Sequence, residues 1–267
     1  MLEYGRVRIR MIANYHTHTY RCGHAVGSER EYVEAAMRAG LRTLGISDHT
    51  PYDFFDSAPR NRPMRMKPEE LPEYAQSVRT LAAEMSGRIE ILLGVEAEYY
   101  PKYFGRTLSL LRDNGVEYMI LGQHFLGNEI DAPYSGLKSD REEVLTSYVD
   151  QCIEALGTGL FTYFAHPDLV HFTGGDEVYT RHIRRLCRAA RETGTPLEIN
   201  LLGMREGRHY PTERFWQIAA EEGNAVILGC DAHSPEQLLS PEYEQSALEL
   251  IRRLGLKLLD SAEIRRI

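Results

Sequence analysis

The stretch MIANYHTHTYRCGHA at residues 11–25 joins a short apolar run to a group of histidines. Met11–Tyr15 has the apolar, β-rich composition of a buried strand, and His16, His18 and His24 follow at its end. In an extended chain, side chains two residues apart point to the same side. The imidazoles of His16 and His18 can therefore bind one metal ion.

Six further apolar runs repeat this pattern along the chain. They are Thr43–Ser47, Ile89–Val95, Tyr118–Gly122, Phe161–Ala165, Leu197–Leu201 and Ala225–Gly229. Each run is short and nearly continuously apolar, which is typical of parallel strands covered on both faces. Amphipathic stretches separate the runs. The alternation predicts an α/β fold, either a closed barrel or a doubly wound sheet.

Capping signals mark where several helices begin and end. Two capping boxes, each a Ser followed three residues later by a Glu, are predicted at Ser28–Glu31 and Ser139–Glu142. We expect the first helix to end at Gly40 and the second at Gly157. Another helix is expected to begin at Pro235, because proline is tolerated in a first helical turn.

Most of the histidines fall at one kind of position, the C-terminal end of a predicted strand. Seven of the ten do so, namely His16, His18, His24, His49, His124, His166 and His233. The carboxylates Glu96 and Asp231 end two of the same runs. A parallel barrel brings all its strand ends to one face. The position of these side chains therefore favours the barrel and predicts that they converge there.

Imidazole nitrogens and carboxylate oxygens are the ligands of Zn²⁺, Mn²⁺ and Fe²⁺. Nine ligands exceed what one ion accepts, so two or three divalent transition metals are predicted, with Glu96 as the bridging carboxylate. The remaining histidines and two nearby cysteines are expected not to be ligands: His171, His182, His209, Cys22 and Cys230.

Composition excludes several classes of protein. The 267 residues carry 31 Lys and Arg against 39 Asp and Glu, a net charge of −8. This balance disfavours a nucleic-acid partner. No run approaches the roughly 20 apolar residues that span a membrane. The four cysteines form no CxxC pair and no secretory signal is evident, so we expect reduced thiols in a cytoplasmic protein. The oligomeric state is left open.

Motifs of other catalytic chemistries are missing from the sequence. It contains no GxxxxGK[ST], GxGxxG or GxSxG segment, and no Asp-x-Asp nucleophile. The chemistry that remains is metal-assisted hydrolysis.

The chain resembles the polymerase-and-histidinol-phosphatase (PHP) superfamily, most closely its monofunctional histidinol-phosphatases. The matching pieces are HTHTYRCGHA at 16–25, SDHTPY at 47–52, GVEAEYYP at 94–101, GQHFL at 122–126, AHPDL at 165–169, EINLLGMR at 198–205 and GCDAHSP at 229–235. The resemblance implies a distorted (β/α)7 TIM-like barrel, a single domain over residues 1–267 with an N-terminal extension at 1–10. We assign no function to that extension.

The resemblance also implies a trinuclear metal site. One ion would be held by His16, His18, Glu96 and Asp231. A second would share Glu96 and take His124 and His166. The third would be held by His24, His49 and His233.

The reaction implied is hydrolysis of L-histidinol phosphate, a phosphate monoester, in histidine biosynthesis. Asp48 is a candidate proton shuttle or a partner of a metal ligand. Arg205 is the candidate phosphate contact, with Arg208, Arg60 and Arg62 as competitors. A cationic substrate calls for an acidic or aromatic outer wall, for which the loops after the second and third strands offer Tyr52, Asp53, Phe54, Phe55, Asp56, Glu98, Tyr99 and Tyr100.

Three other functions stay open at this stage. The substrate can be a different small phosphate, such as a nucleotide or sugar phosphate. A nuclease needs a basic groove, which the acidic balance disfavours. A non-catalytic metal protein differs from an enzyme only in having no open coordination position. An amidohydrolase is disfavoured, since no strand ends in the lysine that such enzymes usually use as a ligand.

Overall fold

The computed structural model describes residues 11–54, 64–128 and 133–267 and contains one parallel β-sheet. Its strands lie side by side in chain order. They are β1 (Ala13–Asn14), β2 (Thr43–Ile46), β3 (Glu90–Ala97), β4 (Tyr118–Leu121), β5 (Phe161–Phe164), β6 (Leu197–Asn200), β7 (Ala225–Gly229) and β8 (Lys257–Leu258). All seven predicted strands are present. The two-residue β8 was not predicted, because so short a strand has no readable period.

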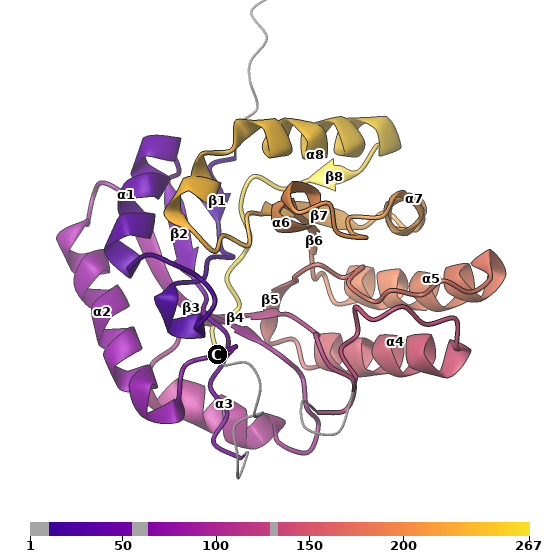
Figure 1. Ribbon diagram of the computed structural model, residues 1–267, viewed down its shortest axis with the longest axis horizontal. Coiled ribbons are helices and arrows are strands. Elements are labelled where there is room, and N and C mark those ends of the chain that lie inside the picture. The colour runs from indigo at the N-terminus through magenta and orange to yellow at the C-terminus, as the bar shows by residue number, and fades with distance from the viewer. Residues whose placement is uncertain (1–10, 55–63, 129–132) are drawn as a thin grey trace, which may run out of the picture.

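Helices form an outer layer around the strands (Figure 1). The α-helices are α1 (Glu29–Ala39), α2 (Leu71–Glu84), α3 (Phe104–Asp113), α4 (Glu142–Gly157), α5 (Asp176–Glu192), α6 (Leu201–Arg205), α7 (Glu213–Glu221) and α8 (Pro241–Leu254). The 3₁₀ helices are η1 (Tyr20–Cys22), η2 (Pro68–Glu70) and η3 (Pro235–Leu239). No helix within the described ranges combines the length and apolar character needed to cross a bilayer.

The sheet curls until its first and seventh strands approach each other at their C-terminal ends. There Thr17 and Ala232 form a parallel bridge, and the His18 amide donates to the Ala232 carbonyl at 2.9 Å. At the opposite end β8 pairs with the start of β7, with Ala225 beside Lys257. The predicted distorted barrel of seven βα units is confirmed, with β8 added at its N-terminal end.

The capping boxes have different outcomes. Ser28 caps α1 as predicted, and Gly40 ends that helix with a φ of 79°. The second box is wrong: α4 begins at Glu142 with Arg141 as its N-cap, although it ends at Gly157 as expected. Ser139 cannot serve as the cap because it forms a bridge with Phe172. Pro235 begins only the short η3.

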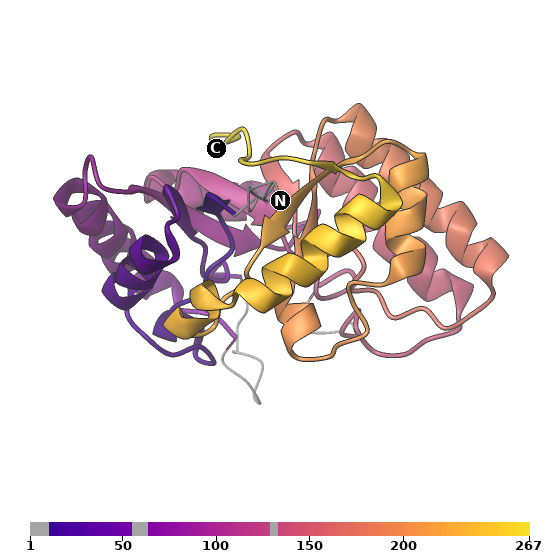
Figure 2. The same cartoon turned by 90° about the horizontal axis from the view of Figure 1, so that it is seen from above.

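The N-terminal half of the barrel interior is filled by tyrosines. Tyr15, Tyr118 and Tyr163 are buried, and the Tyr118 hydroxyl donates to the Tyr15 carbonyl at 2.8 Å. The chain after β8 packs beneath them, and the Ala262 amide donates to the Tyr15 hydroxyl at 3.2 Å. Figure 2 shows this C-terminal segment running along the upper edge of the molecule. The barrel is therefore closed at its N-terminal end, which leaves the opposite end for a site.

Candidate metal centre

The nine predicted ligands converge at the C-terminal ends of the strands. Their donor atoms form overlapping groups in which all members lie within 4.8 Å of one another. These groups are His16–His18–Glu96, His16–His166–Asp231, His49–Glu96–His124 and His24–His49–His233. The last is the third ligand set expected from the sequence. The structure thus brings the predicted side chains together, while their assignment to individual ions stays a prediction.

Glu96, near the end of β3, lies between two of these groups. Its Oε1 is 2.8 Å from His166 Nε2, and its Oε2 is 3.4 Å from His18 Nε2 and 3.0 Å from His49 Nδ1. Gly122 provides room for this carboxylate, because a Cβ there would lie 2.0 Å from Oε1. Such a division of the two oxygens suits a carboxylate that bridges two ions.

Asp231 approaches the same centre from the end of β7. Its Oδ1 lies 3.3 Å from His16 Nε2 and 3.2 Å from His18 Nε2. The backbone of Asp231 has a φ of 46°, and that of His166 has a φ of 32°. Non-glycine residues rarely adopt positive φ, and such strain concentrates at functional sites. In this protein the two residues with positive φ, His166 and Asp231, both place donor atoms in the predicted metal centre.

The geometry of the group His24–His49–His233, called the outer group below, suits a bound cation. His24 Nδ1 lies 2.9 Å from the Cys22 carbonyl and His233 Nδ1 lies 3.0 Å from the Asp231 carbonyl. A carbonyl accepts only, so each neutral ring carries its proton on Nδ1 and a lone pair on Nε2. The two Nε2 atoms lie 2.9 Å apart. Two facing lone pairs repel each other, and a bound cation removes that repulsion.

Charge in the centre is arranged for binding cations. Burial opposes ionisation of Glu96 and Asp231, yet the surrounding histidines hold the pKa of each carboxyl well below its usual range. Burial lowers the pKa of His18 to about 3 and that of His49 well below its ordinary value. Both carboxylates are therefore ionised and these two imidazoles neutral, as metal ligands must be.

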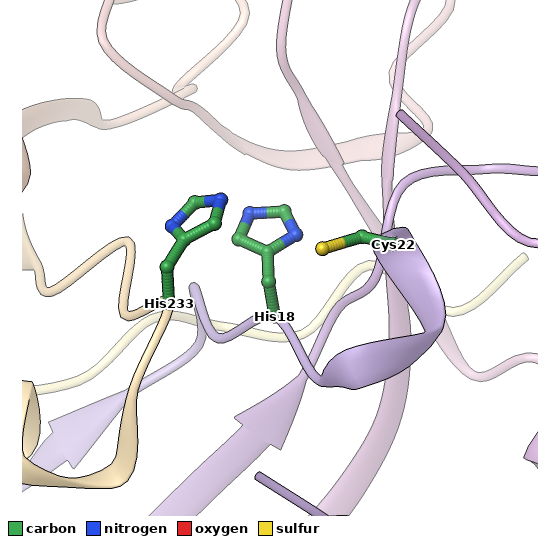
Figure 3. A group of neighbouring side chains, drawn as sticks. All are labelled: His18, Cys22 and His233. Atoms are coloured by element: carbon green, nitrogen blue, oxygen red, sulfur yellow. The ribbon is translucent and has the colours of Figure 1, made fainter. Parts of the chain in front are cut away.

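Cys22 lies closer to the centre than the sequence suggested. Its Sγ lies within 4.8 Å of donor atoms of His18 and His233, and Figure 3 shows the sulfur pointing toward the His18 ring. The side chain is fully buried, and burial raises the pKa of the thiol to about 12. All four cysteines are buried free thiols.

A second layer of carboxylates lies behind the histidines and was not predicted. His16 Nδ1 donates to Glu198 Oε1 at 2.8 Å, and His124 Nδ1 lies 3.3 Å from Glu98 Oε1. A signal existed, because Glu198 and Asn200 end the sixth apolar run with the same two-residue spacing as His16 and His18. The sequence could not say that these side chains contact ligands.

A cavity opens over the predicted ligands, and neither Asp48 nor Arg205 lines it. Asp48 accepts hydrogen bonds from the Thr19 amide and hydroxyl, each at 2.7 Å, so it holds the chain that follows His18. Arg205 donates to the Gln237 carbonyl at 3.2 Å and lies over the Tyr243 ring. Since neither residue lines the cavity, the phosphate contact of Arg205 and the proton-shuttle role of Asp48 stay predictions.

The cavity has a volume of about 820 Å³. Besides six of the predicted ligands, its lining includes Met64, Phe125, Tyr134, Leu202, Glu206, Arg208, His209 and Tyr210. Arg208, previously a competitor of Arg205, is the arginine of this lining. His209 also lines the cavity, and its ring stacks on that of His171 with the centroids 3.9 Å apart. That His209 is not a metal ligand stays a prediction.

The six described residues of the predicted outer wall do not line the cavity. Tyr52, Glu98, Tyr99 and Tyr100 are buried and do not line the cavity. Asp53 pairs with Arg106, and Phe54 stacks on Tyr103. The other two predicted wall residues, Phe55 and Asp56, lie outside the described residues. The same holds for Arg60 and Arg62, two of the candidate phosphate contacts. The rings of Tyr52, Phe54 and Tyr100 pack on one another instead of facing the cavity.

Known proteins share both the sequence and the architecture. The PHP domain model matches residues 14–201. A probable histidinol-phosphatase of Deinococcus radiodurans is 33% identical over 241 residues, which cover 85% of this chain and 88% of the relative. The histidinol phosphate phosphatase of Lactococcus lactis, solved with zinc, L-histidinol and phosphate, superposes with a TM-score of 0.73 at 20% identity, covering 95% of this chain and 99% of that one. This chain therefore belongs to the PHP domain family.

Proposed function

We propose that the protein hydrolyses L-histidinol phosphate to L-histidinol and phosphate. The observation that carries the proposal is the set of candidate metal donors at a cavity of about 820 Å³, with the Nε2 atoms of His24 and His233 2.9 Å apart. The Deinococcus and Schizosaccharomyces pombe relatives, the latter 25% identical over 249 residues, are both named probable histidinol-phosphatases. These names support the substrate, since motifs alone define only the chemistry.

Two or three divalent ions, Zn²⁺, Mn²⁺ or Fe²⁺, fit this donor set. We assign the first to His16, His18, Glu96 and Asp231, the second to Glu96, His124 and His166, and the third to His24, His49 and His233. When bound, such ions polarise phosphoryl oxygens and lower the pKa of the attacking water. The protein holds the carboxylate ligands ionised and orients the imidazoles, and no protein nucleophile is required.

Arg208 is the arginine in the described lining of this cavity. Its guanidinium lies between Glu206, at 2.6 Å from Oε2, and the Tyr210 hydroxyl, at 2.7 Å. These contacts orient a planar donor that can bind two phosphoryl oxygens at once. Arg208 therefore positions the phosphate over the histidines.

The remainder of the substrate would lie against the outer lining. Histidinol phosphate carries an ammonium group and an imidazole besides the phosphate. Phe125 and Tyr134 offer aromatic faces, with ring centroids 5.8 Å apart. Glu206 is the carboxylate of the described lining that belongs to no metal group. An aromatic wall together with the Glu206 carboxylate, which also pairs with Arg208, suits a small organic cation.

A phosphate-release assay on metal-loaded protein tests the proposal. Histidinol phosphate should exceed p-nitrophenyl phosphate, ribose phosphate and AMP in kcat/KM by several orders of magnitude. Comparable kcat/KM values for all four substrates would reject histidinol phosphate as the specific substrate and would indicate a metal-dependent phosphatase of another specificity. Absence of phosphate release from every substrate by the metal-replete protein would reject the catalytic function.

A further inference from the structure

Glu198, at the C-terminal end of β6, is a fully buried carboxylate with four hydrogen-bond donors around it. Its Oε1 accepts from His16 Nδ1 at 2.8 Å and from the Tyr163 hydroxyl at 3.3 Å. Its Oε2 accepts from the His166 amide and from Asn200 Nδ2, both at 3.0 Å. Among the described residues, its only ion-pair partner is His16.

These contacts reach all three members of one metal group. His16 is held through its ring and His166 through its backbone amide. Asp231 is reached through Asn200, whose Nδ2 also donates to Asp231 Oδ2 at 3.1 Å. The donor atoms of His16, His166 and Asp231 all lie within 4.8 Å of one another. We infer that Glu198 is the positioning residue of this inner group and makes it the tightest metal-binding part of the centre.

The physical reason lies in the orientation and basicity of His16. Glu198 accepts a hydrogen bond from the proton-bearing Nδ1 of His16, so the ring presents its Nε2 lone pair to the metal. A carboxylate partner also makes the imidazole a stronger donor. The contact with the His166 amide stabilises a backbone held at positive φ. One carboxylate thus orients two ligands directly and a third through Asn200.

The chain makes room for this carboxylate at a specific position. A Cβ on Gly229 of β7 would lie 1.7 Å from Glu198 Oε1. Burying a carboxylate without an arginine or lysine is costly unless hydrogen bonds satisfy it. A glycine beside it and four donors around it are the features that make this burial possible.

In the outer group, His24 and His233 lack such a carboxylate partner. His24 and His233 are oriented by backbone carbonyls, which are neutral acceptors, and the cavity reaches both of them. His16 and His166 do not line the cavity. The inner ion should therefore be retained against a chelator longer than the outer ion.

The decisive variant is Glu198→Gln, which keeps the size of the side chain and removes its charge. Wild-type and variant protein are loaded with Zn²⁺, and metal affinity is measured by competition with a chromogenic chelator. We expect the tightest ion to bind about 10- to 100-fold more weakly, with the weaker sites unchanged. Loading with Co²⁺ should show a changed visible spectrum for the tightest site.

The matched control is Glu222→Gln. Glu222 is also a buried carboxylate, but its partners are Arg184, Arg188 and Arg191, on a surface away from the ligands. This variant should bind Zn²⁺ as the wild type does. Asn200→Ala removes the link between Glu198 and Asp231, together with the Asn200 Oδ1 contact to the Gly203 amide at the start of α6, and should weaken the tightest ion less than Glu198→Gln.

A folded Glu198→Gln protein with wild-type affinity for its tightest ion would overturn the inference. If that variant does not fold, unchanged affinity in Asn200→Ala would overturn it instead. The inference rests on the metal part of the proposed function. Because chelator competition uses no substrate, its outcome is independent of whether histidinol phosphate is hydrolysed.

Discussion

His24 Nε2 and His233 Nε2 lie 2.9 Å apart, although the two residues are separated by more than 200 positions in the chain. Each ring is fixed by a backbone carbonyl at its Nδ1. Burial, together with the nearby His233, lowers the pKa of His24, which keeps that ring neutral. Two Nε2 atoms directed at one point define a position for a cation without reference to any relative.

Removing one of these rings should remove one ion. We expect His24→Ala to bind one equivalent of Zn²⁺ less than the wild type, because two nitrogen ligands hold an ion in water poorly. Metal analysis after gel filtration measures this. His182→Ala is the control, since His182 pairs with Glu142 away from the centre. Full metal content in His24→Ala would refute the assignment of the outer site.

Glu96→Ala should damage the centre more than loss of His24 or His233 does. Its two oxygens face different groups of histidines, so its removal disturbs two ions at once. Turnover should fall by at least about 100-fold, and metal content should fall by more than one equivalent. Steady-state kinetics with circular dichroism as a folding check would decide, and near-normal turnover in folded, metal-replete protein would exclude the bridging role.

Metal binding should release protons. In the metal-free chain, burial opposes protonation of His124, but Glu96 and Glu98 raise its pKa to about 9. Asp231, Glu198 and Glu96 likewise raise the pKa of His16, against the effect of burial. Protons on these rings compete with metal. Zn²⁺ affinity should therefore rise between pH 6.5 and about 9, and titration in weak buffer should show acidification.

The same pKa shifts predict that the stability of the metal-free protein falls as the pH rises. A histidine whose pKa is raised by folding adds stability that is complete below its unfolded value near 6.5. That contribution is lost as the pH rises through the folded value, about 9 for His124. The Tm of the metal-free protein should thus fall over this range while that of the Zn²⁺-loaded protein does not. Parallel Tm curves for the two forms would contradict this linkage.

Gly122→Ala should destabilise the protein, because its new Cβ would lie 2.0 Å from Glu96 Oε1. Overpacking of this kind costs about 1–3 kcal/mol, and metal affinity should fall as Glu96 moves. Gly105→Ala is the control: a Cβ there meets nothing within 4 Å, and alanine favours the helix α3. Urea denaturation compares the two variants. Equal stability would mean that Glu96 can shift freely.

Arg208→Ala should raise the KM for a phosphate monoester by about 10- to 100-fold, the effect of losing a charge-assisted contact of about 1.5–3 kcal/mol. Arg205→Ala is the matched control, since Arg205 lies three residues earlier and does not line the cavity. Its KM should stay close to that of the wild type. The reverse ranking would restore Arg205 as the phosphate contact.

Much of this centre follows from local sequence alone. Short apolar runs predict the seven principal strands, because a parallel strand is buried on both faces and hence has an apolar pattern of its own. Histidines at the ends of those runs predict convergence, because parallel strands in a barrel all end on one face. His166 and Asp231 can be predicted as ligands without knowledge of their partners in the fold.

Other features depend on contacts between segments far apart in the chain. Ser139 has the sequence of a helix cap, yet its bridge to Phe172 excludes that role. Arg205 and Arg208 lie in one short segment, and only the packing of α6 and the chain after it decides which of them reaches the cavity. A residue's sequence neighbours do not determine which way such a side chain points.

Glu198 shows most clearly the difference between what the local sequence predicts and what depends on tertiary contacts. Its place at the end of a strand can be read from the sequence, but its role arises from His16, His166 and Asn200, which lie on three different strands or strand ends. The sequence by itself determined which residues could bind metal, because ligand chemistry and strand position are local properties. Only the tertiary structure decided which residues orient those ligands, because orientation depends on distances across the barrel.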